Sequence, residues 1–170
     1  MKVFDPRFES GWHAALELKY ARQNARTILA SRRHSGPLLV QKALYPELDV
    51  CHSVILHPPA GIAGGDVLRL EVELAAGSKA LLTTPGATKW YRAQDQPARQ
   101  ILHFDLAPHA SLEWLPQENI VFDGSRAEME LEVRLGVGAA YCGWEVCCLG
   151  RLASGERFRN GYMRSTSSVY

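Results

Sequence analysis

Several side chains of this 170-residue sequence are of the types that ligate metal ions: cysteine, histidine and carboxylate. The candidates are Cys51, His52, His57, Asp66, His103, His109, Glu113, Glu118, Cys142, Glu145, Cys147 and Cys148. No pair among them has the spacing of a zinc finger or of a metalloprotease helix. Neighbours such as Cys51 and His52 would point to opposite faces of a strand and could not share one ion there. We expect most of the cysteines to be small core residues, and no metal ion to be tightly bound.

Nucleophilic catalysis finds no support in the motifs. The sequence has no Gly-x-Ser-x-Gly elbow, and none of its serines has a patterned base. Cys51 and His52 are adjacent, whereas a nucleophile and its base normally meet across the fold. The glycine-rich residues 57–66 lack the Gly-Lys-Ser/Thr of a phosphate-binding loop and do not open a helix. An enzyme is therefore not expected, although a small metal-dependent hydrolase built on residues 57–66 remains an alternative.

Residues 57–66, here called the glycine loop, read His-Pro-Pro-Ala-Gly-Ile-Ala-Gly-Gly-Asp. The residues that carry its structural signal are His57, Pro58, Pro59, Gly61, Gly64 and Gly65. Proline holds φ at about −65° and glycine admits positive φ, so the run specifies one particular loop shape. A loop this rigid is either a tight structural crossing or a ligand or partner site. Asp66 at its end could accept backbone N–H bonds within its own turn or could ligate a metal ion.

The elements that would position these residues are strands. Apolar and charged residues alternate over residues 68–74 and 129–135, which is typical of a strand with one solvated face. Residues 12–20 alternate in the same way, a polar turn follows at 22–24, and residues 27–30 return as a hairpin. Shorter strands are expected at residues 37–44, 50–56, 79–84 and 100–106. No convincing amphipathic helix appears, so the pattern predicts a mainly β protein with one domain.

Composition excludes several classes of partner. The net charge is only +1, so no general attraction to nucleic acid or to an anionic membrane is expected. No apolar run is long enough to span a membrane. Residues 1–6 lack the apolar core of a signal peptide, and the four cysteines form no Cys-x-x-Cys pair. We therefore expect a cytoplasmic protein without disulfide bonds.

A polar, turn-forming segment at residues 83–89 leads directly into Trp90-Tyr91-Arg92. Aromatic side chains next to arginine are typical of the residues that dominate protein interfaces. We expect Lys89, Tyr91 and Arg92 to contact a partner, and a strand end with aromatic residues in the core is the equally weighted alternative. Trp114 and Trp144 lie in apolar strand patterns and are expected in the core.

The glycine loop is flanked by further motifs in a fixed order. They are Gly11-Trp12, His34-Ser35-Gly36-Pro37, Leu44-Tyr45-Pro46-Glu47, Cys51-His52, Thr83-Thr84-Pro85-Gly86-Ala87-Thr88-Lys89, Tyr91-Arg92, Leu112-Glu113-Trp114-Leu115-Pro116-Gln117-Glu118, Gly143-Trp144-Glu145 and Cys148-Leu149-Gly150-Arg151. On these residues the chain resembles the UreD (UreH) family of urease accessory proteins from residue 11 to about residue 158. The glycine loop is similar to that family's HPPGGIAGGD-type signature, with Ala60 at a common glycine position.

The resemblance implies stacked β-sheets with a β-helix-like open core, and a non-enzymatic role in urease maturation. It implies a scaffold that binds the urease apoprotein and UreF, which recruits the GTPase UreG. It also implies an internal passage through which Ni²⁺ reaches urease by transient contacts. Carried onto this sequence, Asp66 and Glu145 are the preferred residues for lining that passage, with Glu118 as a third.

The end of the sequence departs from the family pattern. The resemblance holds to Phe158, so we expect an incomplete UreD-like β domain at residues 1–158 and a divergent, unstructured tail at residues 159–170. Family members are longer, which predicts a C-terminally truncated product with an exposed sheet edge. A nonfunctional remnant is the second alternative, because the UreF-contacting region of the family lies largely beyond this sequence.

Overall fold

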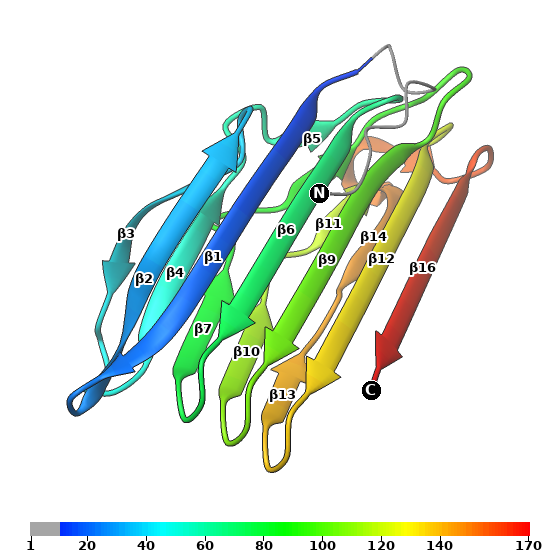
Figure 1. The fold of residues 1–170 in the computed structure, drawn as a ribbon. Helices are drawn as coiled ribbons and strands as arrows, with labels where there is room; N and C mark the ends of the chain where they lie inside the picture. Colours follow the sequence, from blue (N-terminus) through cyan, green and yellow to red (C-terminus); the bar gives the residue numbers. More distant parts are fainter. Residues whose placement is uncertain (1–10) are drawn as a thin grey trace.

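The computed structural model describes residues 11–170, and nearly all of that range is strand and turn. Residues 1–6, which carry the prediction that no signal peptide is present, lie outside the described residues. The chain winds through four coils, each of which places one strand in each of three sheets (Figure 1). The first coil is β4 (Cys51–Leu56), β5 (Gly61–Ile62) and β6 (Val67–Leu74).

The next three coils repeat this path. The second is β7 (Lys79–Thr83), β8 (Thr88–Trp90) and β9 (Ala98–Leu106). The third is β10 (Ser111–Leu115), β11 (Asn119–Val121) and β12 (Arg126–Leu135). The fourth is β13 (Ala140–Gly143), β14 (Cys147–Arg151) and β16 (Tyr162–Val169), with a 3₁₀ turn η1 (Leu152–Ser154) and β15 (Glu156–Arg157) inserted before β16.

Three strands precede the coils. β1 (His13–Gln23) and β2 (Arg26–Ser35) form the predicted antiparallel hairpin, which turns at Asn24 with φ 55°. β1 also pairs in parallel with β6, and β3 (Leu39–Leu44) pairs antiparallel with β4. The hairpin therefore extends the sheet formed by the longest strands, while β3 extends the sheet that begins with β4 (Figure 1).

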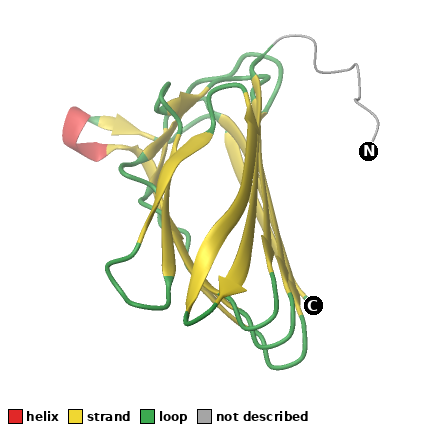
Figure 2. Cartoon of the chain, turned by 60° about the vertical axis from the view of Figure 1, so that its left-hand side comes forward, coloured by secondary structure: helices red, strands yellow, loops and turns green. Residues whose placement is uncertain are grey.

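The resulting sheets have the orders β16-β12-β9-β6-β1-β2, β13-β10-β7-β4-β3 and β15-β14-β11-β8-β5. Pairing between corresponding strands of successive coils is parallel throughout. Figure 2 shows the sheets as facing layers joined by turns. The structure confirms the expectation of a mainly β fold with stacked, β-helix-like sheets. No helix within residues 11–170 is long and apolar enough to cross a membrane.

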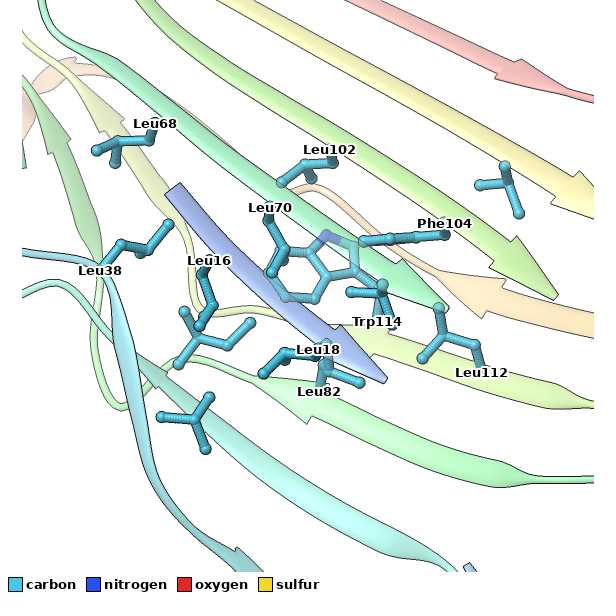
Figure 3. Close-up of a cluster of buried hydrophobic side chains, with 14 of the residues drawn as sticks. Leu16, Leu18, Leu38, Leu68, Leu70, Leu82, Leu102, Phe104, Leu112 and Trp114 are labelled. Carbon is cyan, nitrogen blue, oxygen red and sulfur yellow. The ribbon is translucent and has the colours of Figure 1, made fainter. Parts of the chain in front are cut away.

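The core consists of side chains that stack from coil to coil. Leu16, Leu70 and Leu102 are direct partners on β1, β6 and β9, and all three are buried. Phe104 packs edge-on against Trp114 of the opposite sheet, with ring centroids 5.8 Å apart. Figure 3 shows these side chains converging between the sheets. Alternate residues of the long strands such as β6 point outward, so these strands have one solvated face.

The prediction that residues 159–170 form an unstructured tail is wrong for most of that range. Residues 162–169 form β16, which pairs in parallel with most of β12, from Arg126↔Tyr162 to Val133↔Val169. The strand is mostly exposed and rich in serine and threonine, so its sequence lacks the apolar alternation that marks the other long strands. It is held by backbone pairing to its neighbour, which a local pattern does not reveal.

Two further expectations about the core are corrected. Trp114 is buried as predicted, but Trp144 is 51% exposed, because it faces outward at the corner between β13 and β14. Its indole N–H donates to the Pro116 carbonyl at 3.0 Å. Of the four cysteines, all unpaired, only Cys51 is buried, whereas Cys142 and Cys148 are exposed. They sit on strands of the fourth coil, which has a stacked neighbour on one side only within the described residues.

Replacement of Trp114 should test the stacked core. We expect Trp114→Ala to lower the free energy of unfolding by about 3–5 kcal/mol, because it removes a large buried side chain that packs against Phe104 of the opposite sheet. Trp12→Ala is the control, since Trp12 is 61% exposed, and it should change stability by less than about 0.5 kcal/mol. Urea unfolding followed by the remaining tryptophans would measure both, and equal effects would contradict this description of the core.

Candidate functional site

The glycine loop forms the corner of the first coil and consists of two turns around the short strand β5. The first turn closes when the Ala60 N–H donates to the His57 carbonyl at 2.7 Å. Ala60 then adopts φ 56°, a left-handed conformation that favours glycine. This geometry explains the glycine that the family signature has at this position. The second turn closes through the Asp66 N–H and the Ala63 carbonyl at 3.0 Å.

Asp66 ties the end of the loop to the start of β1. Its Oδ1 accepts the Trp12 N–H at 2.7 Å, and its Oδ2 accepts the Ala63 N–H at 2.8 Å. Each carboxylate oxygen thus holds one backbone donor, which is the turn role that the sequence analysis offers as an alternative to metal ligation. The role of Asp66 in a nickel passage stays a prediction.

Gly61 brings the loop against the side chain of Tyr91. A Cβ at Gly61 would lie 2.2 Å from Tyr91 Cε2, so no larger residue fits without moving the ring. Tyr91 also packs edge-on against Phe122, with ring centroids 5.2 Å apart, and remains 37% exposed. Arg92 is exposed and lies 3.8 Å from an Asp123 carboxylate oxygen. Tyr91 and Arg92 therefore form a surface beside the loop, while Lys89 on β8 is half-buried.

Behind the loop lies a partly open cavity of about 130 Å³, lined by residues of the sheets and of the turn at residues 84–88. Most of its lining is apolar, and its polar residues are His57, Thr84, Thr88 and Gln100. His57 Nδ1 is buried and has no hydrogen-bond partner. Burial lowers the pKa of His57, and the nearby Asp66 carboxylate opposes that shift. The imidazole is therefore neutral at pH 7, the form in which histidine ligates metal ions.

Glu145 is half-buried in the fourth coil, at the corner between β13 and β14. Burial raises the pKa of Glu145, whereas the indole N–H of Trp114 acts in the opposite direction. Glu145 Oε2 and Trp114 Nε1 are both buried and neither reaches hydrogen-bonding geometry with any partner. Burial, together with the Glu145 charge, also raises the pKa of Tyr141 to about 12. Trp114 lines the cavity as well, so one indole separates Glu145 from the space beside His57.

The predicted passage residues do not form one cluster. Asp66 precedes β6 in the first coil, Glu118 precedes β11 in the third, and Glu145 precedes β14 in the fourth. The backbone carbonyl of half-buried Glu118 accepts the Thr88 N–H at 2.9 Å. In the described range, the His, Cys and carboxylate side chains close enough to share an ion are instead His103, Glu130 and Glu132. Sequence reasoning missed this set, because only the strand register brings β9 and β12 together here.

Fold and site together define a three-sided parallel β-solenoid whose interior holds ionisable groups at separate points along its coils. The model of the UreD urease accessory protein family matches residues 13–170. The chain belongs to the UreD family.

Curated relatives agree with this assignment. The chain is 53% identical over 162 residues to the urease accessory protein UreD of Dechloromonas aromatica (strain RCB), covering 95% of this chain and 56% of that protein. It is 54% identical over 159 residues to the protein of the same name from Ralstonia nicotianae, covering 92% and 54%. The Pseudomonas aeruginosa protein is 53% identical over 159 residues, with 93% and 56% covered. The chain thus spans about half the length of the curated relatives it matches.

Glu145→Gln should stabilise the protein at neutral pH. The pKa of Glu145 is raised on folding, so the folded state binds its proton more tightly and stability falls as pH rises from the unfolded pKa through the raised folded pKa. Glutamine removes that loss, so we expect the variant to gain stability over the unchanged protein between pH 4 and pH 7. The exposed Glu113→Gln serves as control and should show no such trend. Urea unfolding across this pH range would contradict the prediction if the Glu145→Gln difference were independent of pH.

Gly61→Ala should disturb the packing between the glycine loop and Tyr91. The added methyl group meets the ring, so we expect a loss of about 1–3 kcal/mol in the free energy of unfolding. Gly86→Ala is the matched control, because nothing lies within 4 Å of a Cβ there. Thermal or urea unfolding measures both variants. Combining Gly61→Ala with Tyr91→Ala should recover most of the loss, and a loss that persists unchanged would assign it to the backbone.

Proposed function

We propose that this protein is a non-catalytic scaffold in urease maturation that binds the urease apoprotein and the accessory proteins UreF and UreG. In this proposal it passes Ni²⁺ through its interior to the urease site. The observation that carries the proposal is the interior of the solenoid, where His57 faces a cavity and half-buried Glu145 has a buried Oε2 without a hydrogen-bond partner. Buried ionisable groups of this kind are costly and are concentrated at functional sites.

The separation of these groups favours passage over storage. Ni²⁺ accepts imidazole, carboxylate and water as ligands. His57 and Glu145 stand on different coils with Trp114 between them, so an ion meets them in succession. The cavity of about 130 Å³ has room for about four water molecules, judged by the share of volume that water occupies in the liquid. An ion that keeps part of its hydration and gains one protein ligand at a time is held weakly and released readily.

Among the passage residues, Glu145 has the strongest physical support and Asp66 the weakest. Glu145 keeps an oxygen without a partner, while both oxygens of Asp66 hold backbone donors. We assign Glu145 and His57 to the passage and Asp66 to the loop that shapes its entrance. Glu118 is a further candidate at the same type of corner as Glu145, one coil away.

The surface formed by Tyr91 and Arg92 is proposed to contact a protein partner. The Tyr91 ring packs against Gly61 on one side and against Phe122 on another. Because the ring is already fixed, little side-chain entropy of Tyr91 would be lost when a partner binds. Arg92 offers a mostly exposed guanidinium whose nearest carboxylate lies at 3.8 Å. We further propose that assembly takes place in the cytoplasm, where the four unpaired cysteines stay reduced.

The partner-binding part of the proposal is tested by coexpression with the urease apoprotein, UreF and UreG and recovery on this chain. We expect a soluble complex, and Arg92→Ala should weaken it about tenfold, as truncation of an interface arginine commonly does. Glu113→Gln is the control. If a longer family member recovers these partners and this chain recovers none, the scaffold function is wrong for this chain and the remnant alternative holds.

Nickel passage is tested separately by measuring nickel in urease matured with each variant. We expect Glu145→Gln to lower nickel loading while complex recovery stays unchanged, because it removes one ligand from the route and leaves the outer surface intact. Gln100→Leu, which removes a polar group from the cavity wall, should act in the same direction. Full nickel loading with both variants would rule out the interior route even if the complex forms.

A further inference from the structure

A second set of potential metal ligands lies on the outer face of the largest sheet, away from the interior. His103 on β9 and Glu132 on β12 are direct partners in the parallel ladder. Glu130 lies two residues before Glu132 and points to the same face. One ligand atom from each of these three residues lies within 4.8 Å of the others. We call this set the outer triad.

The side chains of the outer triad make few hydrogen bonds or ion pairs with other described residues. No hydrogen bond or ion pair to another residue in the range 11–170 holds the side chains of His103 or Glu130. Glu132 pairs with Arg134 at 2.6 Å. On its other side His103 is the direct ladder partner of Glu71 on β6. Carboxylates therefore outnumber cations around the imidazole, and a bound cation would relieve their mutual repulsion.

A small hollow of about 50 Å³ opens beside two members of the triad. It is lined by His103, Phe104, Asp105, Glu132 and Arg134. The hollow is large enough for an ion with a water molecule. The strands that carry the triad are interior strands of the sheet, flanked by β6 and β16, so the ligands are held on rigid elements.

We propose that His103, Glu130 and Glu132 form a binding site for a divalent first-row transition-metal ion on the outer face of this sheet. One imidazole and two carboxylates suit Zn²⁺ and its neighbours in the series, and water completes the coordination. The imidazole makes Mg²⁺ and Ca²⁺ poor occupants, because these ions prefer oxygen ligands alone. The site is separate from the interior route, since its ligands point away from the core.

Arg134 would compete with a metal ion for the Glu132 carboxylate. Its guanidinium holds Glu132 at 2.6 Å and reaches Asp105 at 3.9 Å. A metal ion must displace it from Glu132 to use both carboxylates of β12. Removing Arg134 should therefore tighten metal binding, which is the opposite of what removal of an ordinary structural ion pair would do.

Zn²⁺ titration of the whole chain, by calorimetry and by competition with a chromophoric chelator, tests the proposal. We expect one site in the unchanged protein. His103→Ala and Glu132→Gln should weaken it by at least about tenfold. Arg134→Gln should bind Zn²⁺ more tightly. His34→Ala is the matched control, because His34 is an exposed strand histidine outside the triad, and it should bind as the unchanged protein does.

Circular dichroism should show that all variants fold, because the substituted side chains lie on the solvated face of the sheet. The same titration on Glu145→Gln separates this site from the interior route, and it should leave the outer site unchanged. Equal Zn²⁺ binding by the unchanged protein and His103→Ala would overturn the proposal. So would weaker binding by Arg134→Gln, or displacement of Zn²⁺ by a modest excess of Mg²⁺.

Discussion

The stacking of inward-facing side chains in strict register from coil to coil is the constraint on which the rest of the structure depends. β1, β6, β9 and β12 run parallel, and Leu16, Leu70 and Leu102 meet as direct partners. A slip of one residue on any strand would turn its apolar set toward solvent. The corners must therefore absorb every difference in coil length. The first coil does so with the glycine loop, which Asp66 closes through backbone donors on two segments, and the fourth does so by inserting η1 and β15.

The same constraint explains why the ionisable side chains of His57 and Glu145 lie at corners of the coils, outside the strands. A strand position that faces inward must match an apolar partner on each neighbouring coil, and a charge there would lack compensation. Corner residues have fewer stacked neighbours, so His57 and Glu145 can reach inward there. Even so, burial shifts the pKa of each toward its neutral form. His57 and Glu145 therefore each keep a buried polar atom without a hydrogen-bond partner, and they lie on different coils.

The sequence predicted those features that a local pattern encodes. Alternation over residues 68–74 and 129–135 marks β6 and β12, because period two depends only on one buried face. The pattern failed for β16, which gains its stability from pairing with β12 and carries no apolar alternation. It also failed for Trp144, since hydrophobicity alone suggested that this tryptophan faces inward, whereas at its corner it is 51% exposed. The outer triad depends on the ladder between β9 and β12, which no single segment specifies.

The inner and outer faces of the largest sheet thus differ in how closely ionisable side chains can gather, although one strand register sets both faces. The register that aligns Leu70 with Leu102 also aligns Glu71, His103 and Glu132 on the opposite face, because alternation couples the two sets. Inside, close carboxylates would be destabilised by the loss of water, so ionisable groups stay apart. Outside, water screens their repulsion, so carboxylates can gather around an imidazole at modest cost. Isolated ligands suit transfer, whereas gathered ligands suit retention. The proposed interior route for an ion and the proposed outer metal site would therefore both follow from the same stacked fold.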